Sequence, residues 1–421
     1  MSKTGLSEAM RPGYFDWWHQ ADREARRALV AASFGWMLDS FDVMLYALVL
    51  ASLILDLGIS KQSAGVLGSI TLLAAAAGGL IFGLIADRYG RVRALISSVL
   101  IYAIFTAACG FAQNIVQLAI FRILLGLGMG GEWASGAALV SETWPDKHRG
   151  KALGFMQSSW AIGYALAALA AGLILPWKGW RVVFFVGILP ACLTLVVRRR
   201  VQEPEIWKRN KALPSEGFMH GFRRIFQGNL RPITIAITLM NACTLFAWWG
   251  FNLWVPAYLS LSRDRGGIGL SVHAMSGTVI AMQAGMWIGY VTFGFLSDRF
   301  GRKRCYVLYL ILAALLMFLY ARVHTVWLLL ALGPLVAFFG TGYYTGFATV
   351  TAELYETRIR ATAQGFAYNT GRVASAAAPF AVGRLAQQHG FGIAFATVGA
   401  AFVIAVLCWV WIPETKGRPL I

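Results

Sequence analysis

The sequence predicts an all-α membrane protein, in which twelve transmembrane helices form two parallel six-helix repeats. Of its 421 residues, 58% are hydrophobic and 13% are charged, and the mean hydropathy is +0.62. A soluble domain has about 45–50% apolar and about 25% charged residues. The chain also contains twelve apolar runs, and two of its motifs recur at one fixed spacing. These observations exclude a disordered chain and argue against a soluble enzyme.

The apolar runs lie close together and are joined by short polar loops. Inside lipid the backbone must satisfy its own hydrogen bonds, so runs of this length are expected to be helices. Their approximate limits are 28–55, 62–86, 94–112, 115–139, 152–175, 182–197, 232–259, 272–297, 306–321, 326–351, 362–385 and 391–412. One long polar stretch divides them. We therefore expect an N-terminal tail (1–27), a six-helix bundle (28–197), a linker (198–231), a second six-helix bundle (232–412) and a C-terminal tail (413–421).

The basic residues are strongly biased to one side of the predicted membrane. With the N-terminus inside, 28 of the 37 Lys and Arg residues fall in cytoplasmic loops and tails, 7 fall outside, and Arg122 and Arg372 lie within spans. Cytoplasmic loops carry the excess of Lys and Arg in membrane proteins. We therefore expect both termini in the cytoplasm and the chain in the inner (plasma) membrane. The net charge of +18 reflects this orientation, so no nucleic-acid partner is expected.

No residue pattern indicates a metal, a cofactor or an enzyme. The five cysteines are scattered and form no CxxC pair, and most of them lie inside apolar runs. The chain has no HExxH, GxSxG or P-loop motif, which argues against a membrane enzyme. The linker is too short for the output domain of a sensor. We expect no cofactor and no metal.

The two halves of the chain repeat each other. GLIADRYGRVR at 83–93 recurs as GFLSDRFGRKR at 294–304, an offset of 211 residues. The same offset carries Glu142 and Arg149 onto Glu353 and Arg360. Two separate motifs with one offset indicate a duplicated six-helix unit. Parallel repeats with the substrate between them are a transporter architecture.

These motifs resemble those of the major facilitator superfamily along nearly the whole chain. The loops at 83–93 and 294–304 resemble its signature loop, and RILLGLG at 122–128 resembles its fourth-helix motif. PETKG at 413–417 is similar to the C-terminal tag of its sugar porters. The segments LDSFD (38–42), GMGGEW (128–133), ETWP (142–145) and YNTGR (368–372) resemble the sialate:proton symporter branch, which includes sialic acid and lactate permeases.

The repeated motifs supply acids and arginines at one cytoplasmic level. We interpret them as interhelix ion pairs that hold the cytoplasmic side closed while the outside is open, a role that the resemblance also implies. The glycines would let helices approach closely. A basic loop facing anionic lipid headgroups is the alternative. The gate candidates are Gly83, Asp87, Arg88, Arg91, Glu142, Arg149, Gly294, Asp298, Arg299, Arg302, Glu353 and Arg360.

Three acids lie well inside the spans, where ionisable groups are costly and usually functional. Asp39 and Asp42 share one face of the first helix, about 17 and 21 Å along it. Two close acids in a low dielectric cannot both ionise easily, which suits a proton carrier. Glu132 is a second proton-site candidate, with a buried ion pair as its alternative. The six histidines fall in loops or at span ends, so a histidine relay is not expected.

Arg372 is the main candidate for binding an anion. It lies about 15 Å into the eleventh span, among alanines. A guanidinium at this depth needs an anionic partner and can bind a carboxylate in a bidentate manner. Tyr368 and Asn369 would share its face and donate hydrogen bonds. Pairing with an acid such as Asp42 is the structural alternative. Arg122 would either balance the acids or line the entry.

Aromatic side chains gather in the seventh and tenth spans, where a pocket would lie. The candidates for the substrate site are Trp248, Asn252, Tyr343 and Tyr344. Packing and interface anchoring are the alternatives for such residues.

The charges of the five intramembrane groups favour symport of an anion with protons. With every acid ionised they sum to −1, so one proton makes the cavity neutral and two make it +1. The first function we consider is proton-coupled symport of a small organic carboxylate, either a lactate-like or pyruvate-like monocarboxylate or a sialic acid. A proton-coupled porter of sugars or aromatic acids is the alternative. A drug efflux pump is disfavoured by Arg372. We expect a monomer in the lipid bilayer whose partners are an organic anion and protons.

Overall fold

The computed structural model describes residues 16–188 and 222–417, and every regular element in these ranges is helical. The N-terminal half contains α1 (Asp16–His19), α2 (Arg23–Asp56), α3 (Lys61–Tyr89), α4 (Arg91–Cys109), α5 (Ile115–Thr143) and α6 (Asp146–Val186). The C-terminal half contains α10 (Leu230–Ser260), the 3₁₀ turn η1 (Arg263–Arg265), α11 (Val272–Phe300), α12 (Arg302–Tyr320), α13 (Val326–Thr341), α14 (Tyr344–Leu354), α15 (Thr357–Ser375), α16 (Ala377–Gln388) and α17 (Phe391–Cys408).

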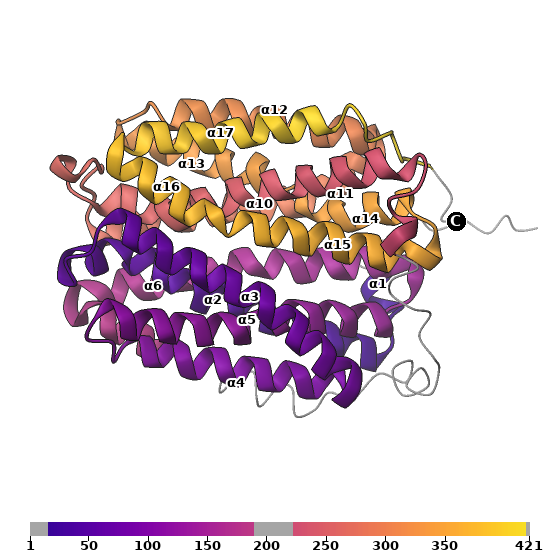
Figure 1. The fold of residues 1–421 in the computed structure, drawn as a ribbon, viewed down its shortest axis with the longest axis horizontal. Helices are drawn as coiled ribbons and strands as arrows, with labels where there is room; N and C mark the ends of the chain where they lie inside the picture. The colour runs from indigo at the N-terminus through magenta and orange to yellow at the C-terminus, as the bar shows by residue number, and fades with distance from the viewer. Residues whose placement is uncertain (1–15, 189–221, 418–421) are drawn as a thin grey trace, which may run out of the picture.

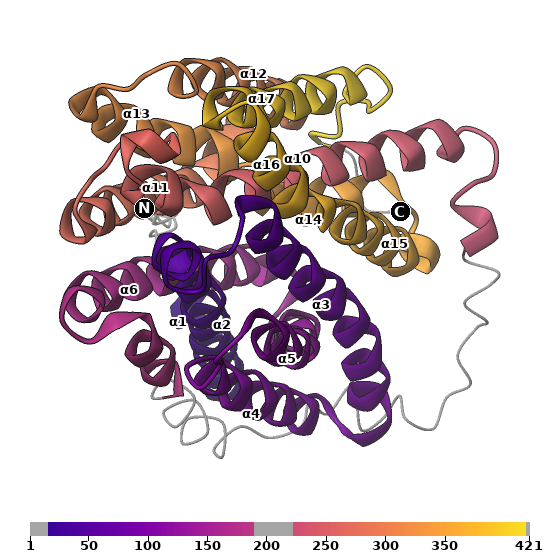
Figure 2. The same ribbon diagram turned by 60° about the vertical axis from the view of Figure 1, so that its left-hand side comes forward.

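The two halves form two helical bundles that lie side by side, with their long helices along the same general direction (Figures 1 and 2). Consecutive helices alternate in direction, which creates two ends. The turns 57–60, 110–114, 261–271 and 389–390 mark one end, called the Lys61 end. The glycines at 90 and 301 and the turns 144–145 and 355–356 mark the other, called the Gly90 end.

Within the described ranges, nine helices are long and apolar enough to cross a membrane. Nine of the twelve predicted runs coincide with these helices, and the fourth, in α5, is matched by a shorter apolar helix at Ile115–Gly131. α6 covers the fifth run and enters the sixth through a kink at Gly179, whose φ is 73°. The sixth run beyond residue 188 lies outside the described residues. The tenth run divides into α13 and α14, and the eleventh divides at Ala376 into α15 and α16.

Small residues bring the helices close together. A Cβ at Gly130 would lie 2.0 Å from the Ala75 carbonyl oxygen, so α5 and α3 touch through their backbones. The expectation that Gly83 and Gly294 mediate such contacts is not met in this conformation. Within the part of the chain that the structure describes, no atom of another helix lies within 4 Å of a Cβ placed at either position.

The closest glycine contact yields a stability prediction. A Cβ at Gly163 of α6 would lie 1.8 Å from the Met37 carbonyl oxygen of α2. Overpacking of this kind costs about 1–3 kcal/mol. We expect Gly163→Ala to lower the thermal unfolding midpoint in detergent. Gly154→Ala is the matched control, because a Cβ at Gly154 on the same helix meets nothing within 4 Å. Equal midpoints for the two variants would contradict the contact.

Hydrogen bonds between the halves hold the Lys61 end together. The Lys61 ammonium donates to the carbonyls of Arg265 (2.7 Å) and Ala386 (3.3 Å). Phe380 N donates to Ser69 Oγ at 3.1 Å, where α16 packs on α3. The Tyr164 hydroxyl of α6 donates to the Asn252 carbonyl of α10 at 3.0 Å. The halves are therefore in direct contact on the Lys61 side of their interface.

Candidate substrate and proton site

Arg372 is a buried cation near the end of α15. Its side chain is only 6% exposed. Within the part of the chain that the structure describes, no carboxylate lies within 4.0 Å of the guanidinium. The predicted pairing of Arg372 with Asp42 is therefore not present. A desolvated guanidinium without a counter-ion favours the binding of an anion from outside the protein.

The depth of Arg372 follows from the contacts between α10 and α15–α16. Asn241 Nδ2 donates to the Ala367 carbonyl at 3.1 Å, and Trp254 Nε1 donates to the Pro379 carbonyl at 3.0 Å. The two pairs are separated by 126 and 125 residues, so the segments run parallel in a constant register. This register places Arg372 beside residues 246–247. Trp248 and Trp249 then lie less than one turn closer to the Lys61 end.

Polar groups from both halves surround Arg372. The Tyr368 hydroxyl lies within electrostatic range of Arg372 and of Asp39 on α2. Tyr290 of α11 lies within electrostatic range of Tyr368 and close to Gln157 of α6. Asp39 itself is 1% exposed. The predicted residues Arg372, Tyr368 and Asp39 are thus gathered where the two halves meet.

Four tryptophans join the halves beside this polar group. The ring centroids of Trp36 (α2) and Trp160 (α6) are 4.6 Å apart. Trp160 contacts Trp248 of α10 at 5.6 Å, and Trp248 contacts Trp249 at 4.7 Å. The indole N–H groups of Trp36 and Trp160 are buried and have no hydrogen-bond partner among the described residues. Because Trp36 and Asp39 are three residues apart on α2, they share one face.

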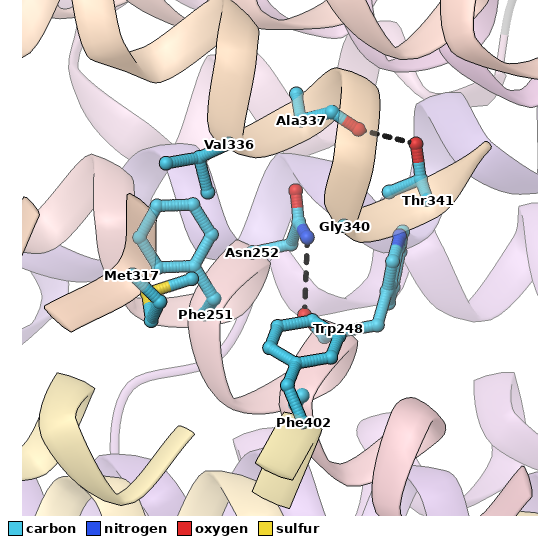
Figure 3. Close-up of a pocket in the computed structure, with 10 residues that line it drawn as sticks. Trp248, Phe251, Asn252, Met317, Val336, Ala337, Gly340, Thr341 and Phe402 are labelled. Atoms are coloured by element: carbon cyan, nitrogen blue, oxygen red, sulfur yellow. Dashed lines mark hydrogen bonds between the residues drawn. The ribbon is translucent and has the colours of Figure 1, made fainter. Parts of the chain in front are cut away.

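Asn252 and part of Trp248 face the interior of the C-terminal bundle. The Asn252 amide donates to the Trp248 carbonyl at 3.1 Å, as Figure 3 shows. The surrounding cavity has a volume of only about 10 Å³ and is also lined by Phe251, Met317 and Phe402. It has room for about one water molecule. Asn252 therefore shapes the packing of α10 in this conformation, and this cavity is not a substrate chamber.

Tyr343 and Tyr344 lie at the junction between α13 and α14. Their ring centroids are 4.8 Å apart, and both hydroxyls are buried without a partner among the described residues. Tyr344 also lies within electrostatic range of Tyr290. The phenol groups of Tyr368, Tyr290 and Tyr344 are thus each within electrostatic range of the next and extend into the C-terminal bundle.

Asp42 and Arg122 lie inside the N-terminal bundle. Both carboxylate oxygens of Asp42 are buried without a partner in the described part of the chain. A Cβ at Gly187 would lie 2.9 Å from Asp42 Oδ1, so this acid points toward α6. Arg122 donates from Nε to Thr71 Oγ1 at 3.0 Å and lies 4.0 Å from the Tyr46 ring centroid. Neither contact involves an acid, so balancing the acids, lining the entry and a purely structural role all stay open for Arg122.

Two predicted site residues keep their roles only as predictions. Asn369 is exposed, and its amide donates to the Gly365 carbonyl of its own helix at 2.9 Å, which leaves its oxygen and one N–H unused by that bond. The side chain of Glu132 lies outside the described residues.

Three gate candidates of the C-terminal half, Asp298, Arg302 and Glu353, form a charged cluster at the Gly90 end. Arg302 pairs with Asp298 and also with Glu353 at 3.3 Å, which joins α12 to α14. The Thr415 hydroxyl donates to Glu353 at 2.5 Å. Arg360 donates to the Ala352 carbonyl at 3.0 Å. These bonds lie within one half, so the cluster holds the C-terminal bundle together at this end.

Glu414 of the PETKG segment caps α12. Its carboxylate accepts hydrogen bonds from the backbone N–H groups of Arg302 (2.8 Å), Lys303 (3.2 Å), Thr415 (3.0 Å) and Lys416 (3.0 Å). Partial burial raises the pKa of Glu414, but these four donors outweigh it and hold the pKa below its ordinary value. The segment therefore has a local structural role.

The N-terminal copy of the gate is described only in part. Arg88 is exposed and lies 5.4 Å from the centroid of the Tyr89 ring, as its copy Arg299 lies 5.4 Å from that of Phe300. The side chains of Asp87, Arg91, Glu142 and Arg149 lie outside the described residues.

The sequence reasoning missed Trp36, Trp160 and Tyr290. A signal existed for Trp36, because it precedes Asp39 by three residues. Trp160 and Tyr290 had no such signal, since a single aromatic residue in a span usually packs against other helices or anchors the span at the membrane interface.

Known proteins resemble this chain along most of its length. It is 35% identical over 412 residues to a probable 4-methylmuconolactone transporter of Cupriavidus pinatubonensis, covering 96% of this chain and 94% of that protein. It is 33% identical to the cis,cis-muconate transport protein of Acinetobacter baylyi (93% and 95%) and 29% identical to the sialic acid transporter NanX of Escherichia coli (92% and 93%).

The fold also matches solved structures. A partially occluded inward-open structure of the xylose transporter XylE from Escherichia coli has a TM-score of 0.76 and 20% identity, covering 95% of this chain and 100% of that one. This confirms the predicted fold of two parallel six-helix repeats. The sequence profile of the Major Facilitator Superfamily matches residues 32–277 and 265–420. The chain therefore belongs to the Major Facilitator Superfamily, whose members transport small molecules across membranes.

Proposed function

We propose that this transporter is a proton-coupled symporter of an organic carboxylate with a planar, unsaturated body. The observation that supports this most is Arg372, a buried guanidinium with no counter-ion among the described residues. Arg372 would bind the carboxylate through two parallel hydrogen bonds, and the Tyr368 hydroxyl would donate a third.

The tryptophans beside Arg372 favour a flat substrate body. Measured along the helix axis, Trp248 and Trp249 lie within one turn of the level of Arg372, and Trp160 and Trp36 extend the aromatic surface into the N-terminal half. Offset or edge-to-face contacts with such rings contribute about 0.5–1.5 kcal/mol per pair. A lactate-like acid would leave this surface unused, whereas an aromatic or diene acid would cover it.

The relatives support the carboxylate. Muconate, methylmuconolactone and sialic acid, the substrates in the names of three relatives, all carry a carboxylate. The PETKG tail, which suggested a sugar substrate, caps α12 at the Gly90 end, so it carries no argument about the substrate.

Asp39 and Asp42 would carry the proton. Asp42 is 2% exposed and neither of its oxygens has a hydrogen-bond partner among the described residues, so the ionised form would be costly there and the neutral acid is favoured. Asp39 lies in range of Tyr368, which also faces Arg372. The charge of a substrate bound at Arg372 and the protonation of the acid on α2 would therefore influence each other electrostatically across the interface.

The Gly90 end would face the cytoplasm of the inner membrane, with both termini on that side, as the 28-to-7 distribution of basic residues requires. Single cysteines at Ser262 and Ser215 test this. We expect an impermeant thiol reagent to label position 262 from outside, and position 215 only after the membrane is opened. Equal labelling from outside would contradict the orientation.

Transport itself can be tested in proteoliposomes. Labelled benzoate, muconate, lactate and sialic acid would be offered with and without an inward proton gradient. We expect accumulation of the planar acids above equilibrium, and loss of that accumulation with a protonophore. Accumulation of lactate alone, or accumulation that does not depend on the proton gradient, would contradict the proposal.

A further inference from the structure

A groove at the Gly90 end combines cations with an exposed apolar wall. It has a volume of about 760 Å³ and lies where α12 meets the end of α11 and the PETKG segment. Its cationic side chains are Lys303, Arg304 and Lys416, and its apolar ones include Phe300, Leu308 and Ile311. The groove is separate from the polar region around Arg372. α12 lies at the outer edge of the bundle in both views (Figures 1 and 2).

The cations of the groove are available to an anion. The Lys303 ammonium donates to the Ile412 carbonyl at 2.9 Å and the Lys416 ammonium to the Arg299 carbonyl at 2.8 Å, which holds both in place. Each ammonium has two further donors. Arg304 is exposed and has no ion-pair partner among the residues described. The one acid in the lining, Glu414, already accepts four backbone hydrogen bonds.

An apolar stripe continues from the groove along α12. Leu308, Ile311, Leu315 and Leu319 are 53%, 41%, 59% and 49% exposed. Their spacing places them on one face of the helix, over a length of about 16 Å. This is close to half of the roughly 30 Å hydrocarbon thickness of a bilayer. The 19 residues of α12 span about 28 Å, so its first turn lies at headgroup level.

We propose that this groove binds an anionic glycerophospholipid, with the phosphate between Lys303, Arg304 and Lys416 and one acyl chain along the stripe on α12. The N-terminal repeat lacks this combination. Arg93 is the copy of Arg304, but the offset of 211 places Val92 at the position of Lys303 and Glu205 at the position of Lys416, so two of the three cations have no counterpart in the sequence. The site is therefore a property of the C-terminal half and not of basic loops in general.

Native mass spectrometry of the full-length protein in detergent can test the site. Dioleoyl phosphatidylglycerol would be titrated against dioleoyl phosphatidylcholine. The variant Arg304→Gln/Lys416→Gln removes two of the three cations of the groove. Each basic residue at a membrane surface adds to the attraction for anionic lipid, so we expect the first binding step for phosphatidylglycerol to be about 30-fold weaker. The charge-matched control Arg93→Gln/Lys151→Gln, at exposed positions of the same end, should bind like wild type.

A short-chain probe separates the headgroup from the acyl stripe. Dihexanoyl phosphatidylglycerol carries the same charge but covers less of the stripe, so we expect it to bind more weakly than the dioleoyl lipid. Three results would overturn the proposal: equal binding of the two headgroups by wild type, equal losses in the site and control variants, or equal affinity for the short and long chains.

Discussion

Replacing Arg372 with lysine is expected to weaken binding of the transported acid by roughly 30-fold or more. Lysine keeps the charge but loses the planar two-point fork that fits a carboxylate. Disrupting a buried charge contact typically costs about 2–5 kcal/mol, and about 1.4 kcal/mol corresponds to tenfold in affinity. Binding of the acid and of its neutral amide to wild type and variant measures the effect. Wild type should strongly prefer the acid, and Arg372→Lys should lose most of that preference.

The control for this prediction is Arg384→Lys on α16. Arg384 is exposed, and its position near the Lys61 end places it away from the polar region. This variant should retain the preference of wild type for the acid. If a folded Arg372→Lys protein discriminated as well as wild type, Arg372 would be a structural residue and the anion site would move toward Arg122.

The membrane spans and the repeat could be predicted because each has a strong physical cause. Lipid forces the backbone into long apolar helices, so composition located nearly every span. The shared offset of 211 between motifs revealed the duplication without any knowledge of packing. The breaks at Ala376 and between α13 and α14 were not predicted, because alanine-rich and aromatic segments there are compatible with continuous helix.

The site was predictable only in its charged members. Burial of Arg372 and Asp39 followed from the cost of charges in lipid, which leaves few positions for them. Tyr368 and Asn369 are about 100° apart around one helix, so the sequence could not decide which of them faces Arg372. The structure places Tyr368 there and leaves Asn369 exposed.

Contacts between distant segments could not be predicted at all. The bonds of Glu414 to the first turn of α12 join residues more than one hundred positions apart. The contact between Trp36 and Trp160 depends on how α2 packs against α6. Neither interaction has a local signature in the sequence, because each residue is compatible with its own helix or tail whether or not the distant partner is present. The same holds for the groove that α12 forms with the C-terminal segment.

The second large effect is expected at Asp39 and Asp42, where asparagine would keep the shape of the side chain but cannot carry a proton. We expect Asp39→Asn and Asp42→Asn each to abolish accumulation driven by a proton gradient while exchange of internal and external substrate continues. The reason is that exchange needs only the anion site, whereas accumulation needs a group that binds and releases a proton in each cycle.

Comparison of gradient-driven uptake with counterflow in the same proteoliposomes measures this separation. Asp56→Asn is the matched control on the same helix, because Asp56 is half-exposed in a pair with Arg181 at 3.0 Å, and exposed pairs contribute little. It should accumulate substrate like wild type. The two sites also differ from each other: Asp39 lies within electrostatic range of Tyr368 of the other half, whereas Asp42 lies inside the N-terminal bundle. Loss of substrate affinity should therefore accompany Asp39→Asn more than Asp42→Asn. If both variants still concentrated substrate against its gradient, the proton would be carried elsewhere, and Glu132 would be the next residue to replace.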